Sequence, residues 1–253
     1  MTTVLKLGGS VVTEKDEPEQ VDEAALAWTA DAVAASGVER LVVVHGGGSF
    51  GHHHAATYGV STTDGTHDPG AVADIHGAMK TLNRRVVDAL LARDVPAVPV
   101  HPLSVGARDG DGALALPVES VRTLLDEGFV PVLHGDLVAH AGEGVTVVSG
   151  DELVTSLARS LDADRVGMCS TVPGVLNDTG DVIPRIRAFD DVADVLGRSD
   201  TTDVTGGMAA KVRALLALGA PAFVFGPEEL GPFLRGDDAG TRIEGASGEE
   251  TDA

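Results

Sequence analysis

The chain has 253 residues, and its 39 Asp and Glu residues outnumber its 18 Lys and Arg residues, which gives a formal net charge of −21. This acidity argues against nucleic acid or an anionic membrane as a partner, because both are bound by basic surfaces. With one cysteine, Cys169, no secretory signal and no apolar stretch near the roughly 20 residues of a membrane span, the sequence predicts a cytoplasmic protein without disulfides.

Apolar runs and helical compositions alternate along the chain. The first half predicts a strand at Val4–Leu7, a helix at Val21–Ala35, a strand at Leu41–Val44, a helix at Ala71–Arg93, a proline-containing edge strand at Val95–Val100, a helix at Pro117–Asp126 and a strand at Val130–His134. The second half predicts a hairpin within Leu137–Val148, a helix at Asp151–Leu161, a strand at Arg165–Cys169, an extended piece at Val182–Ile186, helices at Phe189–Leu196 and Gly207–Leu218, and strands at Pro221–Phe225 and Thr241–Ile243.

This alternation predicts an α/β fold, a three-layer αβα sandwich with a mostly parallel central sheet. The sequence contains no repeat and no long linker. We therefore expect a single domain over residues 1–253 with two lobes, residues 1–160 and 161–245, followed by a frayed acidic tail at 246–253.

Three glycine clusters adjoin the predicted strands and helices, at Gly8-Gly9, at Gly46 to Gly51 and at Gly206-Gly207. The middle cluster matches the pattern GxGxxG, but the acidic residue nearest the spacing of a dinucleotide site, Asp68, falls in a loop. No phosphate-binding loop ending in Gly-Lys-Ser/Thr occurs either. Glycines let backbone N–H groups approach an anion, and such loops cluster at the carboxyl ends of parallel strands.

Lysine is scarce, since the chain contains only Lys6, Lys15, Lys80 and Lys211. An acidic, lysine-poor surface favours a halophilic protein, because self-repulsion is tolerable when ~1 M salt shortens the screening length to about 3 Å. An acidic mesophilic protein is the alternative. Three of these lysines adjoin glycine clusters, whereas Lys80 lies on a predicted helix and reads as a surface residue. Cations and backbone amides gathered in one crevice suit a polyphosphate, which indicates a phosphotransferase.

The motifs Lys6-Leu7-Gly8-Gly9-Ser10, Gly46-Gly47-Gly48, Ser149-Gly150-Asp151 and Thr205-Gly206-Gly207-Met208 with Lys211 resemble the amino acid kinase superfamily in order and spacing. Within it, the run from His45 to His52 is similar to that of the isopentenyl phosphate kinases of archaea, which use ATP to convert isopentenyl phosphate into isopentenyl diphosphate in a variant mevalonate pathway. The resemblance implies that residues 1–160 hold the phosphoryl acceptor and residues 161–245 the nucleotide. It also implies a homodimer, and Mg²⁺ held mainly by phosphate oxygens rather than by protein ligands.

The resemblance also assigns roles by motif. It implies that Lys6, Lys15, His52 and Asp151 are catalytic, with Lys15 stabilising the transferring phosphoryl group and Asp151 orienting the lysines. The residues that it implies for ATP binding are Lys6, Gly8, Gly9, Ser10, Gly48, Gly207 and Lys211. Those that it implies for the acceptor phosphate are Gly47, His52 and Gly150. One departure is Thr171, where the family often has aspartate.

The chemistry of the acceptor agrees with these roles. A phosphomonoester has a second pKa near 6, so at neutral pH it is already a nucleophilic anion and needs no general base. His52 then serves as a hydrogen-bond donor. The neighbouring His53 and His54 are expected to be packing or surface residues, because consecutive side chains diverge and cannot share a metal. Val72, Ile75 and Met79 follow the second glycine cluster with helical spacing and are candidates for an apolar pocket or for ordinary core.

Two other functions remain open from the sequence. One is a kinase of the same fold that acts on fosfomycin or an amino-acid carboxylate, since a carboxylate acceptor also needs no base. The other is a regulatory module that binds a nucleotide or anion without turnover. The presence of Lys15 and His52 argues against the second alternative, because binding alone does not require them.

Overall fold

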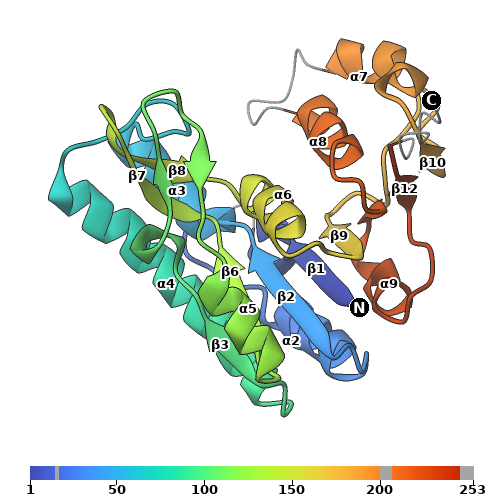
Figure 1. Cartoon of the computed structure of the whole chain (residues 1–253), viewed down its shortest axis with the longest axis horizontal. Coiled ribbons are helices and arrows are strands. Elements are labelled where there is room, and N and C mark those ends of the chain that lie inside the picture. Colours follow the sequence, from blue (N-terminus) through green and yellow to red (C-terminus); the bar gives the residue numbers. More distant parts are fainter. Residues whose placement is uncertain (15–16, 200–206, 246–253) are drawn as a thin grey trace, which may run out of the picture.

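The computed structural model describes residues 1–14, 17–199 and 207–245. Its larger sheet has eight strands in the order β10-β12-β11-β9-β1-β2-β6-β3 (Figure 1). All neighbouring strands in it are parallel except β11 and β12, which are antiparallel. The strands are β1 (Thr2–Leu7), β2 (Arg40–His45), β3 (Ala97–Pro99), β6 (Val130–His134), β9 (Arg165–Cys169), β10 (Arg185–Ile186), β11 (Ala222–Phe225) and β12 (Thr241–Ile243). The predicted mostly parallel sheet is confirmed.

Helices cover both faces of this sheet. They are α1 (Gly9–Val12), α2 (Glu23–Ala34), α3 (Gly48–Tyr58), α4 (Pro69–Leu91), α5 (Glu119–Asp126), α6 (Gly150–Ser160), α7 (Ala193–Ser199), α8 (Gly207–Leu216) and α9 (Leu230–Leu234). Short 3₁₀ turns occur at Pro102–Ser104, Phe189–Asp191 and Pro227–Glu229. Among the residues described, no helix is long and apolar enough to cross a membrane.

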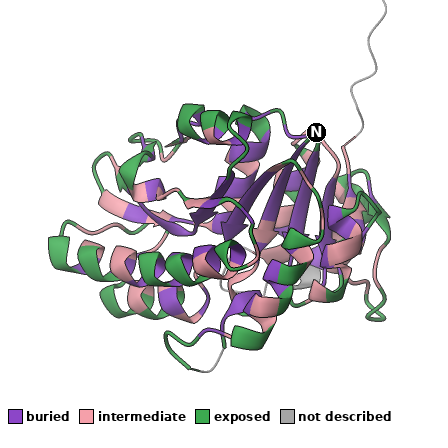
Figure 2. Cartoon of the chain, turned by 90° about the horizontal axis from the view of Figure 1, so that it is seen from below, coloured by how far each residue is buried: buried purple, intermediate pink, exposed green. Residues whose placement is uncertain are grey.

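The two faces of the sheet have separate apolar clusters, because successive side chains of a strand point to opposite sides. Val4 and Val42 pack in one cluster with residues of α5, α6 and α8. Leu5 and Val43 pack in the other with residues of α2, α4 and α9. Figure 2 shows the resulting layers, with buried strands between helices whose outer faces are exposed. These layers are the predicted αβα sandwich.

A smaller sheet has the strand order β5-β4-β7-β8 and continues from the end of β6. Its strands are β4 (Ala107–Arg108), β5 (Leu114–Ala115), β7 (Asp136–His140) and β8 (Gly144–Val148). The antiparallel pair β7 and β8 is the predicted hairpin. Because β8 leads directly into α6, this sheet is joined to the helix that begins at Gly150.

Apart from shifted ends and elements that the sequence did not predict, such as α3, β4 and β5, the structure differs from the sequence-based elements at two places. A single helix at Phe189–Leu196 was wrong, since a 3₁₀ turn ends at Asp191 and α7 starts at Ala193. The Asp191 carboxylate accepts hydrogen bonds from the N–H groups of Arg187 and Ala188. These bonds stabilise the 3₁₀ turn as a unit separate from α7. The glycine cluster after β1 does not form a loop throughout, since Gly9 begins the single-turn helix α1. Lys15, Thr205, Gly206 and the predicted tail at 246–253 lie outside the described residues.

Candidate active site

A pocket of about 460 Å³ opens where β1, β2 and β6 end. Ligands of α/β proteins bind at this edge, because the loops that follow parallel strands meet there. The pocket walls come from the end of β1, the loops after β1, β2, β6 and β8, and the helices α3, α4, α6 and α8. Segments from both halves of the chain therefore surround one cavity.

Two of the scarce lysines meet on one carboxylate in this pocket. Lys6 Nζ lies 2.9 Å from Asp151 Oδ1, and Lys211 Nζ lies 3.7 Å from Asp151 Oδ2. Burial disfavours the charged form of Asp151, but the ammonium groups of Lys6 and Lys211 outweigh it, so the pKa of this carboxyl lies below its ordinary value. The carboxylate stays ionised at neutral pH and holds two cations side by side.

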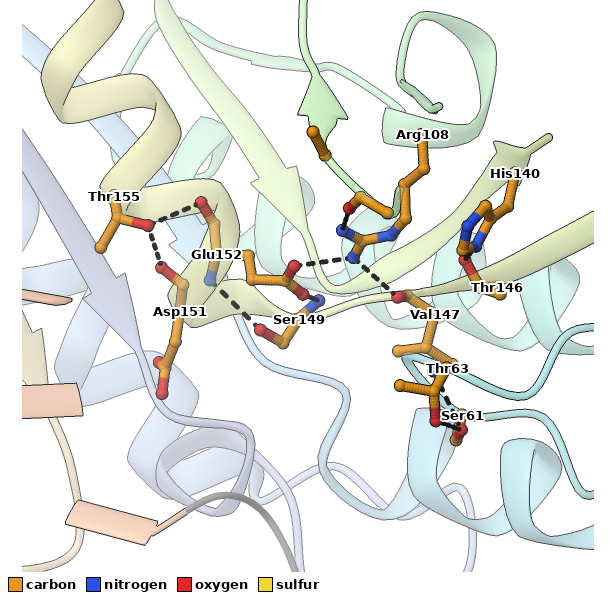
Figure 3. Close-up of polar contacts among 12 residues, drawn as sticks. Ser61, Thr63, Arg108, His140, Thr146, Val147, Ser149, Asp151, Glu152 and Thr155 are labelled. Atoms are coloured by element: carbon orange, nitrogen blue, oxygen red, sulfur yellow. Dashed lines mark hydrogen bonds and ion pairs between the residues drawn. The ribbon is translucent and has the colours of Figure 1, made fainter. Parts of the chain in front are cut away.

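The N-terminus of α6 is fixed by a capping box (Figure 3). The Ser149 hydroxyl accepts the Glu152 N–H at 3.1 Å, and the Glu152 carboxylate accepts the Ser149 N–H at 3.0 Å. Arg108 then donates to Glu152 at 2.7 Å and to the carbonyl oxygen of Val147 at 3.2 Å. Figure 3 shows Asp151 pointing away from this cluster. The cap therefore fixes the helix end from which Gly150 and Asp151 reach the pocket.

Backbone segments approach one another closely at the glycines of the pocket. A Cβ atom on Gly9 would lie 2.2 Å from the Gly48 nitrogen, and one on Gly46 would lie 2.6 Å from the Gly9 nitrogen. No side chain fits at these distances, so the loops after β1 and β2 require glycine in order to pack. A Cβ on Gly150 would lie 3.1 Å from Lys6 Cε, which places α6 directly against the first lysine.

Residues 1–220 match the amino acid kinase family. A protein from Haloferax volcanii named isopentenyl phosphate kinase is 68% identical over 96% of this chain and 98% of its own length. The chain belongs to this family. A second relative of the same name, from Methanothermobacter thermautotrophicus, is 35% identical over 85% of this chain and 86% of its own length. A crystal structure of an isopentenyl phosphate kinase aligns with a TM-score of 0.82 at 28% identity, over 96% of this chain and 100% of that one.

The wider fold extends beyond isopentenyl phosphate kinases, since an aspartate kinase from Synechocystis aligns with a TM-score of 0.69 at 19% identity, over 96% of this chain and 39% of that one. The family membership confirms the resemblance that the motifs indicated. The halophilic source of the relative at 68% identity agrees with the acidic, lysine-poor composition.

Most site residues predicted from the family motifs lie around the one pocket. Those that line it are Lys6, Gly9, Ser10, Gly47, His52, Gly150, Asp151, Gly207 and Lys211. Gly8 and Gly48 lie behind this lining. The Gly8 N–H donates to the carbonyl oxygen of Cys169 at 2.8 Å, and Gly48, with φ of +49°, packs against Thr13. Lys15 is outside the described residues, so its predicted role stays a prediction.

Part of the pocket lining is apolar. Ala55 of α3, Ile75 and Met79 of α4, and Val147 and Val148 of β8 form this part. Of the three apolar candidates from the sequence, Ile75 and Met79 reach the pocket, whereas Val72 packs with the cluster of Val60, Ile75 and Leu137. The pocket thus joins a cationic region to an apolar one.

None of the remaining unusual residues lines the pocket. His53 is exposed, and His54 pairs with the Glu19 carboxylate, so neither of them lines the pocket. Thr171 is exposed after β9 and is not part of the lining. Lys80 is exposed on α4, as expected for a surface residue.

Sequence reasoning missed Gly135 and Asp136, which line the pocket after β6, and Thr155 of α6. The repeated dipeptide His-Gly is the pattern that could have found Gly135. It occurs after two strands, at His45-Gly46 and His134-Gly135, and once on α4, at His76-Gly77. The two strand histidines are register partners on β2 and β6. Two neighbouring parallel strands therefore end in the same dipeptide at the same level.

Proposed function

We propose that this chain transfers the γ-phosphoryl group of ATP to isopentenyl phosphate and releases isopentenyl diphosphate and ADP. The observation that carries the proposal is one pocket whose lining contains both the two lysines that share Asp151 and the apolar side chains of Ile75 and Met79. A phosphorylated prenyl chain matches both parts, since its phosphate requires cations and amides and its tail requires an apolar surface. The relatives named isopentenyl phosphate kinase support the same substrate.

The proposed roles follow the motifs. Gly9, Ser10, Gly207 and Lys211 bind ATP together with Lys6, and Gly8 and Gly48 support the loops that do so. Gly47, His52 and Gly150 bind the acceptor phosphate through N–H groups. Asp151 keeps the ammonium groups of Lys6 and Lys211 together, and Lys15 stabilises the transferring phosphoryl group.

The chemistry requires no general base. The acceptor phosphate is mostly a dianion at neutral pH, because its second pKa is near 6. A bond forms between one of its oxygens and the γ-phosphorus, while the bond from that phosphorus to the β–γ bridging oxygen breaks and the electron pair leaves with ADP. Positioning of the two phosphates and neutralisation of the charge on the transferred group are then the main tasks of Lys6 and Lys211.

Mg²⁺ would enter with ATP and neutralise phosphate charge. Each of the three pocket carboxylates in the described residues already has a partner: Asp151 pairs with two lysines, Glu152 with Arg108, and Asp136 with His76. This donor set fits an ion held by phosphate oxygens, which also suit the preference of Mg²⁺ for oxygen ligands.

An assay of ADP release tests the function. The protein is incubated at high salt with Mg·ATP and, separately, isopentenyl phosphate, dimethylallyl phosphate, fosfomycin, acetylglutamate or UMP. We expect turnover on the prenyl phosphates. Turnover on acetylglutamate or fosfomycin alone would refute isopentenyl phosphate as the acceptor. Binding of ATP without turnover on any of these compounds would favour a regulatory module.

We also propose that the protein is a homodimer, which rests on the resemblance to related kinases, and that it is cytoplasmic, which rests on the sequence features given above. Light scattering after size-exclusion chromatography at high salt measures its mass in solution. A mass of 25.8 kDa, that of one chain, would refute the dimer.

A further inference from the structure

Two buried histidines stand behind the glycine loops of the pocket. His45 and His134 are both fully buried at the ends of β2 and β6, and their rings stack with centroids 5.6 Å apart. Each ring faces the carbonyl oxygen of the next residue. His45 Nδ1 lies 3.0 Å from Gly46 O, and His134 Nδ1 lies 2.9 Å from Gly135 O. None of the proposed catalytic steps uses these rings.

The surroundings of His45 fix which ring nitrogen carries the proton. Asn83 Nδ2 lies 3.1 Å from His45 Nε2 and 3.4 Å from the carbonyl oxygen of Val132. A carbonyl oxygen only accepts, so the side-chain atom of Asn83 that faces both groups is the amide nitrogen, which donates. His45 Nε2 therefore accepts, and His45 Nδ1 carries the hydrogen and donates to Gly46 O. Burial and the nearby His134 lower the pKa of His45 to about 3, although the hydrogen bond to Gly46 acts to raise it. The ring is therefore uncharged at neutral pH.

This hydrogen bond sets the direction of the next amide. The peptide between Gly46 and Gly47 is trans, so its C=O and N–H groups point in opposite directions. The ring of His45 holds the Gly46 C=O toward the protein interior, which directs the Gly47 N–H toward the opposite, pocket side. A Cβ atom on Gly135 would lie 3.7 Å from the Gly47 nitrogen and 3.6 Å from the Gly150 nitrogen. The backbone nitrogens of Gly47 and Gly150 therefore border the same small space beside Gly135.

We propose that His45, held by Asn83 as the Nδ1–H tautomer, is a positioning residue that aims the Gly47 N–H at the phosphate of the acceptor. The inference rests on the proposed function and adds the device that orients one of its binding groups. Asn83 acts indirectly, through its hydrogen bond to His45. It belongs to α4, and Ile75 and Met79 of the same helix form part of the apolar lining of the pocket. Helix α4 therefore contributes both to the apolar lining and, through Asn83, to the support of the glycine loop.

Two substitutions of similar size separate this role from simple packing. In His45→Asn the side-chain amide nitrogen can take the place of Nδ1 and still donate to Gly46 O. In His45→Gln the amide reaches the place of Nε2 instead and leaves that carbonyl without its donor. We expect His45→Asn to keep the KM for isopentenyl phosphate within about threefold, and His45→Gln to raise it roughly 10- to 100-fold with KM for ATP unchanged, the range of one hydrogen bond to a charged group.

Equal KM values for isopentenyl phosphate in the two variants would overturn the proposal. A rise in KM for ATP that parallels the rise in KM for isopentenyl phosphate in His45→Gln would also overturn it. If the variants do not fold, ¹⁵N NMR of the imidazoles in the unmodified protein still decides, since a hydrogen on His45 Nε2 would contradict the assigned tautomer. An unmodified protein that does not turn over isopentenyl phosphate would instead refute the proposed function, and the NMR result would stand independently of it.

Discussion

Replacement of Asp151 by asparagine tests the arrangement of the two lysines. At an effective dielectric constant of about 20, the gross attraction of the carboxylate is ~6 kcal/mol for the ammonium at 2.9 Å and ~4.5 kcal/mol for the one at 3.7 Å. Desolvation offsets much of this attraction, and the Asp151 side chain is 40% exposed. We therefore expect the substitution to remove about 1.5–3 kcal/mol of net stabilisation of the two ammonium groups. If that loss falls on the transition state, kcat falls roughly 10- to 100-fold.

The same substitution does not weaken ATP binding electrostatically, in contrast to its effect on kcat. Asparagine keeps the shape of the side chain but removes one negative charge, so the pocket becomes more positive toward a polyphosphate. We therefore expect KM for ATP to stay within about threefold of its original value while kcat falls. Initial rates of ADP release at saturating isopentenyl phosphate and varied ATP measure both quantities.

Asp88→Asn is the matched control. Asp88 also forms an ion pair, at 2.7 Å from Arg84, but both side chains are exposed on the surface of α4. Such a surface pair contributes little, so this variant should keep kcat and melting temperature. An unchanged kcat in Asp151→Asn, or a rise in KM for ATP that matches the fall in kcat, would refute the orienting role.

Three further predictions concern the pocket and its support. A Cβ on Gly135 meets its neighbours only at 3.6 Å or more, whereas one on Gly9 would lie 2.2 Å from the Gly48 nitrogen. Gly135→Ala should therefore fold normally in thermal melts and raise KM for isopentenyl phosphate at least about threefold, while Gly9→Ala should lower the melting temperature by several degrees. Arg108→Met removes the buried partner of Glu152 and should lower the free energy of unfolding by about 1–3 kcal/mol in urea titrations, with part of the loss recovered in Arg108→Met/Glu152→Gln. Burial lowers the pKa of His134 to about 4, so the unfolded chain binds a proton that the folded chain does not between pH 6.5 and 4. Stability should fall as the pH drops through this window. Replacement of His134 by glutamine should reduce the pH dependence of the free energy of unfolding by about 1 kcal/mol per pH unit in urea titrations at pH 6.5 to 4.5, and an unchanged dependence would contradict the low pKa of His134.

The elements that the sequence predicts well are those that local pattern determines. Val130–His134 is an apolar run between a glycine-containing turn and another glycine, and the structure has a strand with the same bounds. The helix predicted at Asp151–Leu161 begins one residue earlier, at Gly150, because the Ser149 cap and Glu152 define its first turn. Periodicity and capping act within a few residues, so a sequence shows them directly.

The parts that the sequence does not predict depend on tertiary register. Strands β4 and β5 have two residues each, too few for a periodic pattern. Arg108 reaches Glu152 across 44 positions, and His45 meets His134 only because β2 and β6 pair in that register. The family motifs identified nine pocket-lining residues, but Gly135 belongs to none of them, and its place beside Gly47 and Gly150 depends on the pairing of β2 with β6.

The distribution of charge leads to a prediction about salt. A chain with a net charge of −21 repels ATP at long range, whereas Lys6 and Lys211 attract it at contact distance. Raising KCl from 0.1 to 1 M shortens the screening length from about 10 to about 3 Å, which removes the long-range repulsion more completely than the contacts. We expect KM for ATP to stay level or fall over this range, as measured by initial rates with folding checked by circular dichroism at each salt concentration. A steep rise in KM for ATP would mean that the cations of the pocket dominate at all distances and that the acidic surface does not oppose ATP binding.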